Sequence, residues 1–119
     1  MNFRLVHPDP ARTAPVHMDG VKDVRMEILV GRQHGAPNFS MRHFVVEPGG
    51  HTPHHQHDYE HEILILKGNG RAQSAAGERT FKAGDVIWVP PNEMHQFVNT
   101  GPTPLEFICL IPAPKDCSR

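Results

Sequence analysis

Hydrophobic and polar residues alternate along most of this chain in short runs, and turn residues separate the runs. A period of two is typical of a strand that buries one face. The pattern predicts strands at 24–30, 41–47, 61–66, 71–74, 79–82, 86–89, 95–99 and 105–111. No segment has a convincing apolar period of 3.6 residues, so the chain is predicted to be all-β, as a sandwich, barrel or jelly roll.

Glycine, proline and asparagine mark the turns between these runs. Pro48-Gly49-Gly50 is expected to break the chain, and Ala76-Gly77 to close a hairpin. We expect one domain over 21–112, an irregular N-terminal arm over 1–20 with at most one short strand, and a C-terminal tail over 113–119.

The run from Ile63 to Leu66 is apolar on both strand faces. A strand buried on both sides fits a barrel wall whose outer face is covered by another sheet or another subunit. The pattern therefore indicates a barrel, and it is also the first sign of a dimer.

Composition excludes several classes. The 119 residues suffice for one domain, with 38% hydrophobic and 21% charged residues. Lys plus Arg is 12 and Asp plus Glu is 13, so no basic field is available to hold nucleic acid. No apolar run approaches the roughly 18–20 residues of a membrane span, and residues 1–12 lack a stretch of signal-peptide length. We expect a cytoplasmic protein in which Cys109 and Cys117 are free thiols.

Histidine is unusually frequent, with ten residues, five of them between His51 and His61. Residues i and i+2 of a strand point to the same side, so His55 and His57 should project together. His61 and His95 each open a later strand and can face the same interior. Neutral imidazoles in such a cluster suit Mn, Fe, Co, Ni, Cu or Zn, and not Ca or Mg.

Two spaced motifs carry these histidines. In the first, five residues separate Gly49 from His55, one separates His55 from His57, three separate His57 from His61, and six precede Gly68. The second runs Gly84, Pro90, Asn92, His95, Asn99, with gaps of five, one, two and three residues. They resemble the two motifs of the cupin superfamily, which implies a double-stranded β-helix, or jelly-roll barrel, from about Val21 to Pro112. Asn92 stands where the family usually has Gly, and Asn tolerates the left-handed turn conformation.

Most cupins have Glu as the third ligand, and here Glu62 is adjacent to His61. Counting back six residues from Gly68 gives His61 the position of that Glu. Strand parity places His61, Ile63 and Ile65 inside and Glu62, Leu64 and Leu66 outside. We therefore favour His55, His57, His61 and His95 as the ligands of one divalent metal, with Glu62 as the alternative to His61.

Five further stretches resemble a small group of four-histidine cupins that bind manganese as homodimers. They are Ala36–Phe39, Glu47–Gly50, Glu60–Ile63, Pro91–His95 and Phe107–Pro112. The resemblance implies a homodimer and makes manganese the first choice of metal, before Fe, Ni, Cu, Co or Zn. It implies no substrate.

Parity also predicts which residues line the substrate pocket. On the last strand Glu106 is expected to face water, which turns Cys109 inward. Cys109 then either tunes the chemistry or is a small buried hydrophobe. Arg42 either points inward and holds a carboxylate or enolate, or faces solvent. The predicted pocket residues are Arg42, Phe44, Ile63, Ile65, Phe97, Phe107, Cys109 and Ile111.

The remaining histidines and aromatic residues receive simpler interpretations. His51 and His54 are expected at the rim of the site. His7, His17, His34 and His43 are expected to be ordinary surface or half-buried residues. Trp88, Tyr59 and Phe97 are expected to pack, and Tyr59 lies where it could gate the cavity.

Three functions fit such a site. The first is a metal-dependent oxidoreductase of dioxygenase type, which acts on a small carboxylate or enolisable compound at two open metal positions. The second is a non-redox isomerase, decarboxylase or lyase, which would need a general base beyond Glu62 or Cys109. The third is a metabolite-binding module without catalysis.

Overall fold

The computed structural model describes residues 3–116 and consists mainly of strands. Their bounds are β1 Ala14–Pro15, β2 Lys22–Val30, β3 Phe39–His51, β4 His61–Lys67, β5 Asn69–Ser74, β6 Gly77–Lys82, β7 Val86–Val89, β8 His95–Asn99 and β9 Leu105–Pro112. Three short 3₁₀ helices complete the described chain, η1 Pro10–Arg12, η2 Arg32–His34 and η3 Ala113–Lys115.

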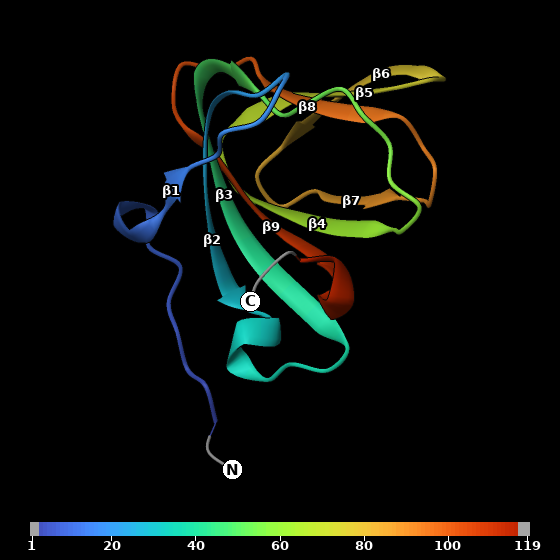
Figure 1. Cartoon of the computed structure of the whole chain (residues 1–119). Coiled ribbons are helices and arrows are strands. Elements are labelled where there is room, and N and C mark those ends of the chain that lie inside the picture. Colours follow the sequence, from blue (N-terminus) through green and yellow to red (C-terminus); the bar gives the residue numbers. More distant parts are fainter. Residues whose placement is uncertain (1–2, 117–119) are drawn as a thin grey trace.

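All the strands belong to one antiparallel sheet. Its order is β6-β5-β8-β3-β9-β4-β7, while β2 pairs with β3 and β1 pairs with β2. The end strands β6 and β7 do not pair, and the sheet curls so that β5, β6 and β8 lie above β4 and β7, with β3 and β9 closing one side (Figure 1). This confirms the predicted all-β jelly-roll barrel.

The barrel interior follows the predicted parity. On β4, His61, Ile63 and Ile65 are buried, whereas Glu62 and Leu64 are exposed. On β9, Phe107, Cys109 and Ile111 belong to the same interior cluster. Rings bridge the two sides of the barrel, because Phe97 of β8 lies 5.8 Å from Phe107, which stacks on Phe44 of β3 at 5.0 Å.

The predicted break at Pro48-Gly49-Gly50 is wrong, because β3 continues through it to His51. Gly49 adopts φ +80°, a left-handed conformation that glycine allows. Pairing with β2 shifts register between Lys22 and Val24 and resumes at His51. The turn residues therefore form an irregularity within a long strand instead of ending it.

The expectation that Glu106 faces water is also wrong, and so is the ordinary surface or half-buried role given to His43. Glu106 is only 8% exposed and His43 is fully buried. His43 Nε2 lies 2.9 Å from Glu106 Oε1, and Lys67 Nζ lies 3.9 Å from the other carboxylate oxygen. The two side chains can leave water because their contact gives His43 Nε2 and Glu106 Oε1 a partner, on a face where Val45 and Ile108 are buried as well. His43 Nδ1 is buried without a partner among the described residues.

Three further expectations concern the cysteines, the N-terminal arm and membrane-spanning segments. Cys109 is a free, buried cysteine, and Cys117 lies outside the described residues. The N-terminal arm contains η1 and the short strand β1. Between residues 3 and 116, no helix is long and apolar enough to cross a membrane.

The buried pair gives a stability prediction. Glu106→Ala should lower the free energy of unfolding by about 1–3 kcal/mol, because it leaves the His43 imidazole buried without its acceptor. Glu106→Gln keeps an acceptor oxygen and should cost less. Urea denaturation measures both, with Lys67→Ala as the control, for which about 0.5 kcal/mol or less is expected at an exposed ion pair. Equal losses for Glu106→Ala and Lys67→Ala would contradict this account.

Candidate metal centre

Backbone pairing brings the two histidine motifs together at one mouth of the barrel. His55, in the segment after β3, forms an isolated bridge with His95, the first residue of β8. The His55 N–H donates to the His95 carbonyl at 3.1 Å, and the His95 N–H donates to the His55 carbonyl at 2.9 Å. The Asn92 N–H donates to the His57 carbonyl at 2.6 Å, and Asn92 adopts φ +67° as its turn position requires.

The four predicted ligands converge at this mouth. Ligand atoms of His55, His57 and His95 all lie within 4.8 Å of one another. His61 lies beside this group, with its ring centroid 4.8 Å from that of His95 and 5.3 Å from that of His57. The structure therefore brings four imidazoles from three chain segments into one cluster.

Neighbouring groups orient these rings. His95 Nδ1 donates to the Glu93 carbonyl at 2.9 Å, and His61 Nδ1 lies 3.4 Å from Cys109 Sγ. His61 Nε2 is buried and has no hydrogen-bond partner. Tyr59 stacks on His57 at 4.7 Å with 13° between the rings, so Tyr59 packs against the cluster. With Nδ1 engaged in this way, the Nε2 lone pairs of His61 and His95 are free for a ligand bond.

Burial keeps the imidazoles neutral. It is the largest cause that lowers the pKa of His55 to about 4 and of His61 to about 3, ahead of the repulsion from neighbouring histidines and Arg42. Burial likewise lowers the pKa of His57 and of His95, although the Glu93 carbonyl opposes the change at His95. Neutral imidazoles offer the lone pairs that a metal ion needs at neutral pH.

A divalent transition metal fits this donor set. Four neutral nitrogens suit Mn, Fe, Co, Ni, Cu or Zn and not the oxygen-preferring Ca or Mg. The buried, unpartnered Nε2 of His61 is an acceptor that a metal ion would satisfy.

Beside the cluster, Arg42, Cys109 and His61 form a row of polar contacts on the inner face of the barrel. Arg42 points inward, its Nη2 donates to Cys109 Sγ at 3.1 Å, and its guanidinium carbon lies 4.9 Å from the centre of the Phe44 ring. Cys109 thus contacts both Arg42 and His61, and burial raises the pKa of its thiol.

A cleft of about 260 Å³ lies between the β5–β6 hairpin and β7 and reaches His95, one of the four clustered histidines. Its lining includes Ala72, Ser74, Trp88, Val89, His95 and Phe97. Of the eight predicted pocket residues, Phe97 lines this cleft, whereas Ile63, Ile65, Phe107, Cys109 and Ile111 are packed in the core behind it. The sequence does not predict the cleft, because the cleft depends on how a hairpin lies against a distant strand.

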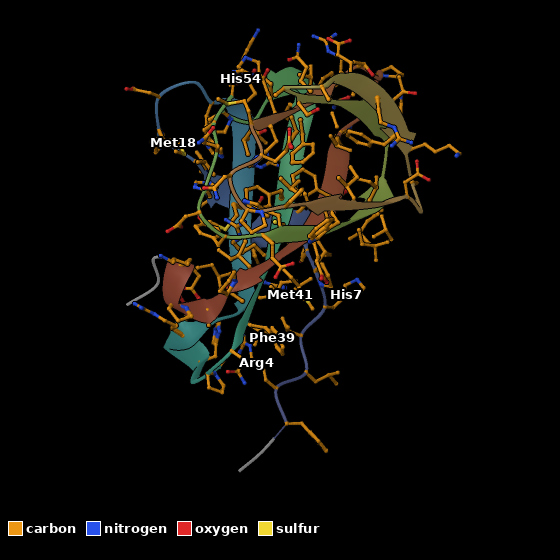
Figure 2. All side chains as sticks on the ribbon, turned by 90° about the vertical axis from the view of Figure 1, so that its right-hand side faces the viewer. Arg4, His7, Met18, Phe39, Met41 and His54 are labelled. Carbon is orange, nitrogen blue, oxygen red and sulfur yellow. The ribbon has the colours of Figure 1, made fainter. Side chains whose placement is uncertain are left out.

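The glutamate and the histidines that were not favoured as metal ligands lie outside the cluster of four imidazoles. Glu62 is exposed and lines a groove on the outer face. His51 Nδ1 lies 3.1 Å from the Thr52 carbonyl oxygen and 3.3 Å from Gln96 Nε2. His54 is exposed and lies at the upper end of the molecule in Figure 2. Trp88 does not pack in the core as expected, because it points outward, 59% exposed, with its indole N–H on Glu60 at 2.8 Å.

Comparison with known proteins identifies the family. Residues 42–111 match the family described as the cupin domain. The chain is a cupin. The matched segment begins at Arg42 and ends at Ile111, so it contains the four clustered histidines and every predicted pocket residue.

Two curated relatives indicate how varied this family is. The chain is 33% identical over 76 residues to 1-methylthio-D-xylulose 5-phosphate methylsulfurylase of Rhodospirillum rubrum, a match that covers 64% of this chain and 49% of the relative. It is 40% identical over 65 residues to the oxalate-binding protein of Thermotoga maritima, covering 54% of each. The cupin therefore spans about half the length of these curated relatives.

Solved structures agree with the fold. The polyketide cyclase RemF from Streptomyces resistomycificus is 28% identical with a TM-score of 0.86, over 94% of this chain and 80% of that one. A predicted oxalate decarboxylase from Thermotoga maritima is 30% identical with a TM-score of 0.74, over 91% and 99%. The same barrel thus carries different activities, and the site must decide between them.

Proposed function

We propose that this cupin binds one divalent transition metal through His55, His57, His61 and His95 and oxidises a small enolisable molecule with dioxygen. The observation that carries the proposal is the convergence of four imidazoles with the buried, unpartnered Nε2 of His61 among them. Manganese is the first choice, with Fe, Ni, Cu, Co and Zn as alternatives.

When bound, such a metal would polarise the carbonyl oxygens of the substrate and hold substrate and dioxygen at neighbouring positions. In the dioxygenase reaction of a 1,3-diketone the bond between one carbonyl carbon and the central carbon breaks, and the two atoms of dioxygen enter the two products, a carboxylic acid and a 2-oxoaldehyde. The substrate supplies all the electrons, so no other reductant is needed.

The chain's own residues would prepare the site. The Glu93 carbonyl and Cys109 orient the rings of His95 and His61. Phe97, at the cleft and 5.8 Å from His95, would shield the reacting atoms from water. Substrate would enter by the cleft between the β5–β6 hairpin and β7.

A non-redox reaction is the second candidate, because the chain resembles a polyketide cyclase over nearly its whole length. Such a reaction needs a general base near the substrate. Among the described residues, Glu62 faces outward and Cys109 is buried with a raised thiol pKa, so neither is placed as that base. Binding without catalysis is the third possibility, since one relative is an oxalate-binding protein.

We also propose a homodimer formed through the outer face of β4 and β7. Leu64, Val86 and Trp88 lie on this face and are 41%, 73% and 59% exposed. Leu64 pairs with Val86 and Glu62 with Trp88, so the exposed side chains are adjacent. A second copy would cover this apolar surface.

A location in the cytoplasm stays a prediction.

The neighbours His61 and Glu62 provide a matched test of the ligand set. Wild-type protein should retain one manganese per chain after dialysis. His61→Ala and His95→Ala should weaken metal binding at least about tenfold, and Glu62→Ala should not. Metal analysis and the absorption spectrum of the cobalt-loaded protein measure this. Loss of metal in Glu62→Ala with retention in His61→Ala would show that the third ligand is Glu62.

Oxygen uptake tests the reaction. With pentane-2,4-dione as substrate, manganese- or iron-loaded protein should consume one dioxygen per substrate cleaved, and His95→Ala should consume none. An oxygen electrode and product analysis measure both quantities. Conversion at the same rate without dioxygen would favour the non-redox reaction, and binding without conversion would favour the binding module.

Light scattering coupled to gel filtration tests the dimer. Wild-type protein should have twice the mass of the chain, and Val86→Lys should be monomeric because a charge would be buried in the interface. Thr80→Lys, an exposed change on β6, should leave the dimer intact. A monomeric wild type, or a dimeric Val86→Lys, would exclude this surface as the interface.

A further inference from the structure

Arg42 is a cation on the inner face of the barrel. It lies on β3 directly opposite Cys109 of β9, and the Phe44 ring supports its guanidinium plane. A guanidinium has five N–H donors. Nη2 donates to the Cys109 sulfur, whereas Nε is buried and has no acceptor. Most of this hydrogen-bonding capacity is therefore unused.

Of the other six arginines between residues 3 and 116, Arg4 and Arg79 are exposed and also have no carboxylate within ion-pair distance, whereas the remaining four are paired. The carboxylates within ion-pair distance are those of Asp9 and Glu27 for Arg12, Glu47 for Arg25, Asp116 for Arg32 and Glu78 for Arg71. Within residues 3–116, no carboxylate lies within that distance of Arg42. A half-buried cation without a counter-ion is costly, and an anionic ligand would offset that cost.

This cation lies next to the imidazole cluster. Arg42 and His61 contact the same sulfur atom, at 3.1 Å and 3.4 Å. After burial and His95, the charge of Arg42 is the next cause that lowers the pKa of both His57 and His61. The charge of Asp58 acts on His57 and that of Glu93 on His95, and neither carboxylate lies within ion-pair distance of Arg42.

We propose that Arg42 binds the carboxylate of a small oxo acid, whose carbonyl end faces the four imidazoles. The planar fork of arginine matches a carboxylate with two parallel hydrogen bonds, which suits an anion better than the point charge of lysine. The Phe44 ring, 4.9 Å from the guanidinium carbon, gives this place an apolar wall. This inference rests on the proposed function, because it assigns the other end of the ligand to the metal.

Acetoacetate and pentane-2,4-dione are a matched pair for the test, since acetoacetate has a carboxylate in place of one acetyl group of the diketone. Calorimetry of manganese-loaded protein without dioxygen should show that acetoacetate binds at least about tenfold more tightly than the diketone. Arg42→Gln should abolish this preference, so that the ratio of the two affinities falls to about one. Arg42→Lys should retain only part of it.

Arg71→Gln is the control, because Arg71 is paired with Glu78 outside the site, and this variant should keep the full preference. Equal affinities in wild-type protein, or an undiminished preference in Arg42→Gln, would overturn the inference. If Arg42→Gln does not fold, the wild-type comparison and Arg42→Lys still decide.

The two proposals fail in different ways. Protein that binds no metal, or consumes no dioxygen with the diketone, contradicts the proposed function. Protein that does both normally but shows no preference for acetoacetate contradicts only the role of Arg42.

Discussion

Two reciprocal hydrogen bonds between the backbones of His55 and His95 join segments that are distant in the sequence, and the site depends on them. They fix the register of the segment after β3 against the start of β8. Strand parity then decides which side chains share the interior, because a slip of one residue would turn His55 and His57 outward. The Asn92 N–H on the His57 carbonyl fixes the same register from the neighbouring turn. A few backbone contacts therefore position a cluster of side chains.

Most of the barrel and the cluster could be predicted from alternation and spacing. The inward positions of His61, Ile63 and Ile65 follow from a period of two, and β4 has this pattern. The errors occur where a local signal competes with long-range pairing. Pro48-Gly49-Gly50 reads as a break, yet β2 pairs across it and β3 continues. Glu106 reads as a surface residue, but its partner His43 lies on another strand, and no local pattern connects the two.

His43 and Arg42 are adjacent in sequence and show two ways in which this protein accommodates polar groups away from water. His43 points to the outer face, where its Nε2 contacts the carboxylate of Glu106. Arg42 points to the inner face, where its described neighbours are a sulfur atom and an aromatic ring. Folding alone would favour pairing or removing such a cation. A cation that folding leaves unpaired beside a candidate metal centre is better explained by a ligand than by stability.

The identity of the third ligand sets the net positive charge of the site that a bound substrate would have to balance. If Glu62 were the ligand, its carboxylate would cancel one charge of a divalent metal. With His61 as the proposed ligand the donor set would be neutral, so a divalent metal would keep both charges and Arg42 would add a third in the same low-dielectric space. A neutral diketone must lose a proton before it can balance any of this charge. An oxo acid arrives with a negative charge, and its carboxylate and its carbonyl would each meet a positive group. His61 in place of Glu62 as the third ligand would therefore favour an anionic substrate, and Arg42 would hold the anion as proposed.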